Sequence, residues 1–148
     1  MDPASLVALI EGSVGLVIQC GGIVKTLSDI AARYKASELS IMSMAQSLDV
    51  IQLAWSRIKD WSQAQWFSLH LNSDDDAFIQ RLNRSLDIGK MVMAGLQEDL
   101  RPYQSDSDVL TFKQRSKAVW NQDALRNHQD RIRDQAASMT LLLQAIQL

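Results

Sequence analysis

The spacing of apolar residues predicts a long first helix over residues 2–34. Asp2 can cap this helix, and Pro3 suits its first turn, where the missing N–H of proline has no partner to lose. From Leu6 onward, apolar residues recur every three or four positions, which is the period of one helix face. The residues of this face are Leu6, Leu9, Ile10, Leu16, Val17, Ile23, Val24, Leu27, Ile30 and Tyr34.

A second apolar stripe, formed by Val7, Val14 and Ile18, lies on another face of the same helix, with Glu11 among its members. A helix that is apolar nearly all round is either central in a bundle or in contact with lipid. Residues 6–24 carry Glu11 as their one charge, and at ~1.5 Å per residue they are long enough to cross a bilayer. Their polar residues and four glycines argue against a permanent transmembrane helix. We therefore expect a core helix in the resting state.

Adjacent glycines in the first helix, Gly21 and Gly22, are candidates for a hinge. A glycine in a helix interior costs up to ~1 kcal/mol relative to alanine, and paired glycines are a recognised cause of kinks. Ala4, Ala8 and Gly12 add a row of small residues at a spacing of four, which would let another helix approach closely.

Four further helices are predicted from the same period and from caps and breaks. They are expected over residues 37–66, 75–101, 109–120 and 123–146. Ser37 is a candidate cap for the first of these, and Pro102 ends the second. No segment alternates with a period of two, so no sheet is expected. The fold class is therefore all-α, an antiparallel bundle of four to five helices forming a single domain over residues 1–148.

The inward positions of these helices follow from the same spacing. In the second helix they are Ile41, Met44, Ala45, Leu48, Ile51, Trp55 and Ile58, with Trp61 and Trp66 near its end. In the third they are Ile79, Leu82, Leu86, Gly89, Met93, Leu96 and Leu100. In the fourth they are Phe112, Val119 and Trp120, and in the last Leu125, His128, Ile132, Ala136, Met139, Leu142, Leu143 and Ile146. Methionine and aromatic residues at this spacing are assigned to the core and not to a ligand pocket.

Composition and charge narrow the possible functions. The chain has 148 residues, 47% of them hydrophobic and 22% charged, which is ordinary for a globular domain. Its net charge of −2 provides no global basic field for nucleic acid. The single cysteine, Cys20, excludes an internal disulfide and agrees with a reducing compartment. A secretory signal is not expected, because no basic residue precedes the apolar run.

Catalytic patterns are scarce. His70 and His128 are far apart in sequence and have no second histidine or cysteine at helical spacing, which disfavours a metal site. Cys20 has no basic neighbour before Lys25 and is interpreted as a buried apolar residue. The acidic run at residues 74–76 lacks the alternation, glycine and final glutamate of a calcium-binding EF-hand loop. We therefore expect neither an enzyme nor a cofactor, and no small-molecule substrate.

Basic residues gather in the last two predicted helices. They are Lys113, Arg115, Lys117, Arg126, Arg131 and Arg133. Such a surface could contact anionic lipid headgroups or a protein partner, at ~1 kcal/mol per basic residue near a membrane. Aspartates interleave with these residues, so the favoured interpretation is a mixed, solvated face.

Both ends of the chain resemble a known family. The motifs are residues 1–6 (MDPASL) before a glycine-punctuated apolar helix, residues 112–120 (FKQRSKAVW), and residues 138–144 (SMTLLLQ). Their order and spacing resemble the HeLo-like N-terminal domains of fungal STAND-type immune receptors and amyloid-signalling proteins. Residues 37–102 match only as a helical pattern. That family is similar in architecture to the four-helix bundle of mixed-lineage kinase domain-like protein, the mammalian executor of necroptosis.

The resemblance implies a cell-death effector domain at the N-terminus of a longer protein. It would be cytoplasmic at rest, self-associate on activation, and then bind and permeabilise the plasma membrane, whose anionic lipids would be its partners. The first helix would insert, which makes Leu6, Leu9, Ile10, Glu11, Val14, Leu16, Val17 and Ile18 the candidate insertion residues. The alternative is a non-lytic adaptor that relays a signal through helix–helix contacts, with the first helix serving only as a core helix.

Overall fold

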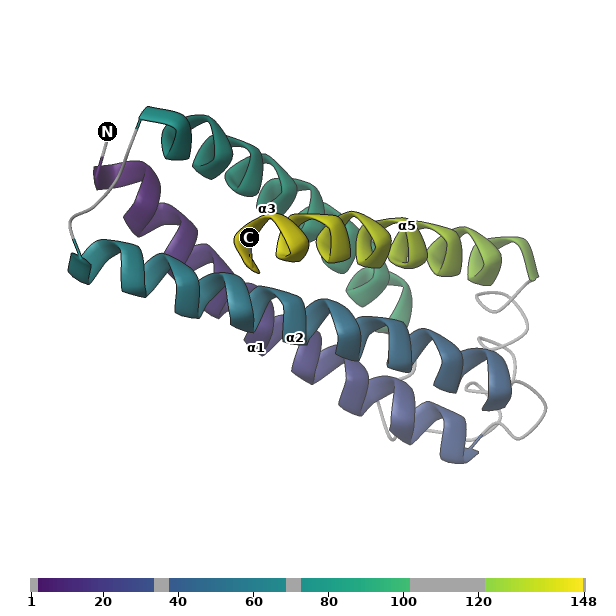
Figure 1. Cartoon of the computed structure of the whole chain (residues 1–148). Helices are drawn as coiled ribbons and strands as arrows, with labels where there is room; N and C mark the ends of the chain where they lie inside the picture. The colour runs from purple at the N-terminus through teal and green to yellow at the C-terminus, as the bar shows by residue number, and fades with distance from the viewer. Residues whose placement is uncertain (1–2, 34–37, 69–72, 102–121, 148) are drawn as a thin grey trace.

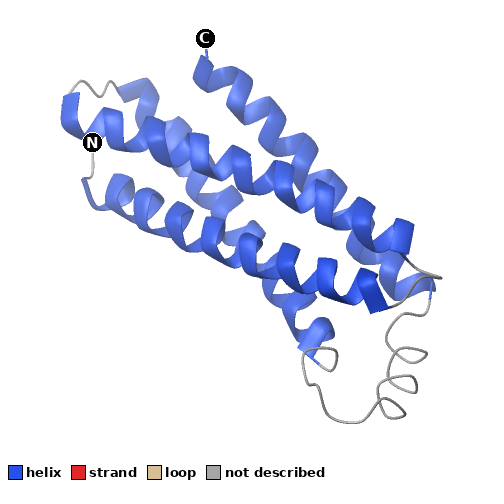
Figure 2. Ribbon diagram, turned by 90° about the horizontal axis from the view of Figure 1, so that it is seen from below, coloured by secondary structure: helices blue, strands red, loops and turns tan. Residues whose placement is uncertain are grey.

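The computed structural model of the whole chain describes residues 3–33, 38–68, 73–101 and 122–147 (Figure 1). Four long helices occupy this part of the chain, and it contains no strand (Figure 2). They are α1 (Pro3–Arg33), α2 (Glu38–Ser68), α3 (Ser73–Leu100) and α5 (Gln122–Gln147). The all-α bundle expected from the sequence is confirmed. The fourth helix expected over residues 109–120 lies outside the described residues.

The helices form a four-cornered bundle in which each packs mainly against two neighbours. α1 lies against α2 and α3, and α5 lies against the same two helices from the other side. Consecutive described helices run in opposite directions, whereas α1 and α3 run in the same direction (Figure 1). Contacts between α1 and α3 show this register, since Asn83 meets Ser5 near the start of both helices and Gln97 meets Gln19 further along. Helices α2 and α3 therefore occupy opposite corners.

The predicted inner faces of α2 and α3 form the centre of the core. Every inward position expected between Ile41 and Ile58, and between Ile79 and Leu100, is buried. Trp55 is fully buried, and Trp61 packs edge-to-face on Phe78 with ring centroids 5.5 Å apart. Trp66 departs from expectation, because it lies in the last turns of α2 and is 41% exposed.

All four helices meet around Gly89 of α3. A Cβ atom added there would lie 3.1 Å from Leu16 of α1, 3.4 Å from Gln135 of α5 and 3.9 Å from Trp55 of α2. A larger side chain would hold these helices apart, since protein cores are packed as densely as organic crystals. Gly89 therefore lets side chains of the other three helices pack closely onto α3.

Candidate functional site

The eight candidate insertion residues of α1 are divided between its two faces. Leu6, Leu9 and Leu16 are buried in the core, and Ile10 and Val17 are partly buried against it. Glu11, Val14 and Ile18 lie on the opposite, exposed face. The division follows from the helical period, because residues three or four apart share a face and residues two apart do not. The candidates thus do not form one surface in this conformation.

The exposed face of α1 is unusually poor in charge. Ile18 is 70% exposed and Val14 is 38% exposed. Small exposed residues surround them, namely Ala4, Ala8, Gly15 and Gly22. Glu11 is the one charged residue between Pro3 and Lys25, and residues 12–24 carry none. A surface helix of a globular protein usually presents charged and polar residues to solvent.

Length and apolarity make α1 the one described helix able to cross a membrane. Residues 4–33 reach a mean hydropathy of 1.8 over an 18-residue window. A third of that window is buried inside the bundle. Core helices of water-soluble proteins can be equally long and apolar. The arrangement of the two faces of α1 therefore says more about its function than the mean hydropathy does.

Helix α1 continues without interruption through the hinge candidates Gly21 and Gly22. Gly22 faces open space, whereas a Cβ atom at Gly21 would lie 2.9 Å from Nε2 of Gln52. That nitrogen donates a 3.1 Å hydrogen bond to the backbone oxygen of Val17. Gly21 is therefore the position at which α2 reaches the backbone of α1, and the α1 helix is regular there.

Two side-chain amides of α3 also hold α1. Nδ2 of Asn83 donates to the backbone oxygen of Ser5 at 3.1 Å, and Nε2 of Gln19 donates to Oε1 of Gln97 at 2.8 Å. Together with Gln52 they attach α1 to its neighbours near its start, at Ser5, and near its middle, at Val17 and Gln19. No pattern in the sequence singles out Gln52 or Asn83, since an amide side chain on the flank of a helix has no distinctive spacing.

Of the row of small residues in α1 (Ala4, Ala8 and Gly12), Gly12 packs closely against α3. A Cβ atom at Gly12 would overlap Cδ2 of Leu86, so α3 packs directly onto the α1 backbone there. Ala4 and Ala8 are exposed instead. They line a shallow groove between the two helices together with Asn83, Arg84 and Asp87.

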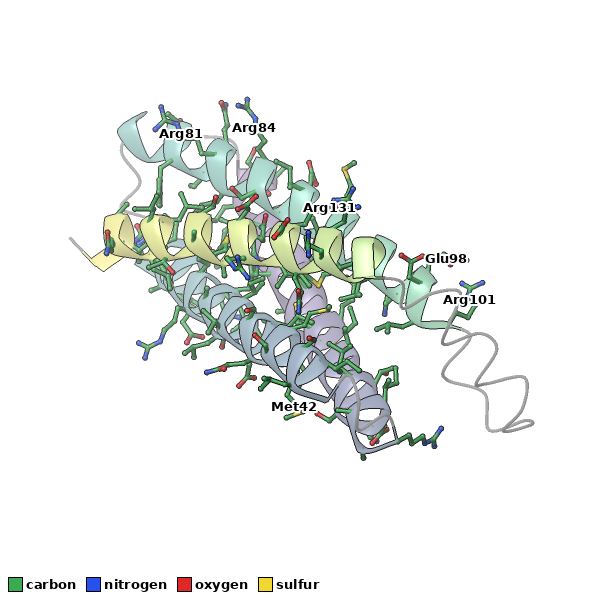
Figure 3. All side chains as sticks on the ribbon, turned by 90° about the vertical axis from the view of Figure 1, so that its right-hand side faces the viewer. Met42, Arg81, Arg84, Glu98, Arg101 and Arg131 are labelled. Atoms are coloured by element: carbon green, nitrogen blue, oxygen red, sulfur yellow. The ribbon has the colours of Figure 1, made fainter. Side chains whose placement is uncertain are left out.

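The basic residues of α5 do not converge into one patch. Arg126, Arg131 and Arg133 are all exposed. Arg126 and Arg133 lie two turns apart on nearly the same line of the helix, while Arg131 lies about 140° round from Arg126 and on the side facing α3 (Figure 3). Asp130 and Asp134 are exposed among them. Lys113, Arg115 and Lys117 lie outside the described residues.

The two candidates for reactive chemistry, Cys20 and His128, are both buried in the bundle. Burial raises the pKa of the Cys20 thiol to about 12, which keeps it protonated at neutral pH. Nε2 of the buried His128 contacts a carboxylate oxygen of Asp99 on α3 and joins α5 to that helix. Across the described residues no three His, Cys, Asp or Glu side chains lie close enough together to hold a metal ion.

Comparisons of this chain with protein families, with curated proteins and with solved structures give no match.

Proposed function

We propose that this domain is a regulated cell-death effector that self-associates on activation and then binds and permeabilises the plasma membrane through α1. The observation that carries the proposal is the exposed face of α1, where Val14 and Ile18 face solvent in a stretch without charge from residue 12 to residue 24. The resemblance of both chain ends to HeLo-like domains supports the same function, including its place in fungal immunity and programmed cell death.

The buried face of α1 implies that insertion is a regulated step. Six of its leucine and isoleucine side chains are at most 2% exposed, namely Leu6, Leu9, Leu16, Ile23, Leu27 and Ile30. Removing them together from the core into water would cost on the order of 10 kcal/mol. Whole domains are stable by only about 5–15 kcal/mol. Helix α1 would therefore stay in the bundle until a lipid bilayer can receive its apolar side chains.

Lipid would offset most of this cost, because the same side chains would pass from the core into hydrocarbon. Glu11 opposes insertion by about 3 kcal/mol on membrane-insertion scales. Self-association of inserted helices would reduce that penalty by placing Glu11 in a shared polar interior. The proposal therefore links oligomerisation and insertion through one residue.

Dye release from vesicles of phosphatidylcholine and phosphatidylserine tests the proposal. The protein is fused at its C-terminus to a chemically induced dimerisation domain, so that self-association can be switched on. Ile18→Asp should abolish release, because it places a charge on the exposed face without entering the core. Leu141→Asp is the matched control on α5, since Leu141 is 67% exposed, and it should release dye like the parent. No release by the parent, or equal release by both variants, would refute the proposal.

The burial of most of the inner face also supports a second candidate, the non-lytic adaptor. In that function α1 never leaves the bundle, and partners bind to exposed charged residues instead. Arg126→Glu combined with Arg131→Glu would then change binding of the downstream partner. The parent protein would not bind vesicles, whether monomeric or self-associated. A vesicle co-sedimentation experiment with the parent protein separates the two candidates.

A further inference from the structure

Helix α2 carries a second apolar stripe on the face that it turns to solvent. Its members are Leu39, Met42, Val50, Leu53 and Phe67, which are between 45% and 85% exposed. Met42 points away from the bundle (Figure 3). These residues span about 42 Å along the helix at ~1.5 Å per residue. Leu39 with Met42, and Val50 with Leu53, form two groups of neighbours, and about 21 Å separates Leu53 from Phe67. Grouped exposed apolar residues are typical of a surface that contacts another protein.

Several residues of this face form matching pairs about Leu53, while Val50 would lie at the height of the other copy's Ser56. When two copies of a helix pair antiparallel around a two-fold axis, a residue of one copy lies beside a residue of the other. The two residue numbers have the same sum at every height along the pair. With Leu53 on the axis, Leu39 lies at the height of the other copy's Phe67, and Met42 at the height of its Ala64. Apolar and small residues therefore meet at the ends and at the centre of the pair.

The polar residues of the face obey the same symmetry with complementary charge. Asp49 lies at the height of the other copy's Arg57, and Gln46 at the height of its Asp60. All four side chains are exposed. Lys59 of the same protomer also lies 3.6 Å from Asp60 and neutralises part of its charge. Each of these acidic residues therefore lies opposite a basic residue or an amide of the other copy. The two-fold axis produces each pairing twice.

We propose that the exposed face of α2 binds a second copy of this chain, forming an antiparallel, two-fold symmetric dimer centred on Leu53. The dimer does not depend on membrane activity, because the exposed face of α1 takes no part in it. Long-range attraction between Asp49 and Arg57 sets the register, and the apolar residues provide most of the contact.

Light scattering coupled to size exclusion tests the dimer over a range of protein concentrations. The parent should show twice the 16.6 kDa mass of the chain, and Leu53→Asp should show the mass of a monomer. Leu53 is 59% exposed, so the variant should keep its helical circular dichroism. Leu141→Asp is the matched control and should remain dimeric. A parent that is monomeric at every concentration, or a Leu53→Asp protein that remains dimeric, would overturn the proposal.

Charge exchange and crosslinking test the register. Arg57→Asp alone should dissociate the dimer, since two acids then meet twice, and adding Asp49→Arg should restore it. In a Cys20→Ala background, the Leu39→Cys and Phe67→Cys proteins should form a disulfide when mixed and oxidised. Leu39→Cys alone should not, because its two thiols would be about 42 Å apart. Efficient crosslinking of Leu39→Cys with itself would exclude this arrangement. Dye release by the monomeric Leu53→Asp protein reports on the membrane proposal separately.

Discussion

Individual glycines of α1 have different roles because their surroundings differ. Gly12 faces Leu86 of α3 at a distance that leaves no room for a methyl group, whereas Gly15 and Gly22 face open space. The same substitution should therefore have opposite effects along one helix. Helix propensity favours alanine by up to ~1 kcal/mol at each position, and overpacking a core costs about 1–3 kcal/mol.

We expect Gly12→Ala to lower the free energy of unfolding by about 1–2 kcal/mol, because Leu86 is buried and cannot move aside freely. Gly15→Ala and Gly22→Ala should each raise it by about 0.5–1 kcal/mol. Urea denaturation followed by circular dichroism measures all three. Stabilisation by Gly12→Ala would mean that α1 and α3 are further apart than described.

The buried thiol of Cys20 should make stability depend on pH in the alkaline range. Its pKa is raised to about 12 in the folded protein from an ordinary value of 9.0, because burial disfavours the thiolate. The folded state therefore holds its proton where the unfolded state has lost it. This contribution to stability is complete below pH 9 and is lost as the pH rises from there towards 12.

We expect the free energy of unfolding of the parent to fall more steeply above pH 9 than that of Cys20→Ala, by up to ~1.4 kcal/mol per pH unit. Urea titrations at several pH values between 8 and 11 give the two slopes. Lysines and tyrosines titrate in both proteins, so their contribution cancels in the difference. Parallel slopes would show that the thiol reaches solvent in the folded state.

At the scale of the element, α1 should tolerate an acid on one face and not on the other. Leu16 is 1% exposed and contacts the crossing point at Gly89, while Ile18 faces solvent. A carboxylate at Leu16 would lose its water in the core, which costs several kcal/mol. We expect Leu16→Asp to unfold the domain or lower its melting temperature by more than 15 °C, and Ile18→Asp to shift it by only a few degrees.

Thermal denaturation followed at 222 nm compares the two variants directly. Equal sensitivity at both positions would indicate that the exposed face of α1 is covered in solution, for example by a second copy or by another segment. The pair of variants therefore also tests whether the stripe of Val14 and Ile18 is available to lipid.

The period of apolar residues was sufficient to predict the four described helices and the inner faces of α2 and α3. Helix ends agreed to within about two residues, which is the ordinary uncertainty of such boundaries. The period identifies the inner face of each helix but not the helix that packs against it. It therefore could not predict that α2 and α3 occupy opposite corners. For that reason it could not identify Asn83 and Gln52 as the side chains that hold α1, or separate Gly12 from Gly15.

At the scale of the whole molecule, the membrane proposal requires the bundle to open. A helix that only lay on the bilayer with Val14 and Ile18 in the headgroup region would leave its inner face in the core. The two mechanisms differ in the fate of Cys20, which is on the inner face, fully buried and the single cysteine of the chain. Its thiol thus reports on the departure of α1 without any substitution.

We expect N-ethylmaleimide, present throughout, to label Cys20 slowly in solution and at least ~10-fold faster once dimerised protein meets vesicles containing phosphatidylserine, since opening exposes the thiol to the reagent. Mass spectrometry of quenched samples gives the rate. Ile18→Asp should show no acceleration, and Leu141→Asp should accelerate like the parent. Dye release without faster labelling would mean that α1 permeabilises the bilayer from the surface, with its core contacts intact. In that case Val14, Ile18 and Glu11 would carry the activity, and Leu6, Leu9 and Leu16 would serve the fold alone.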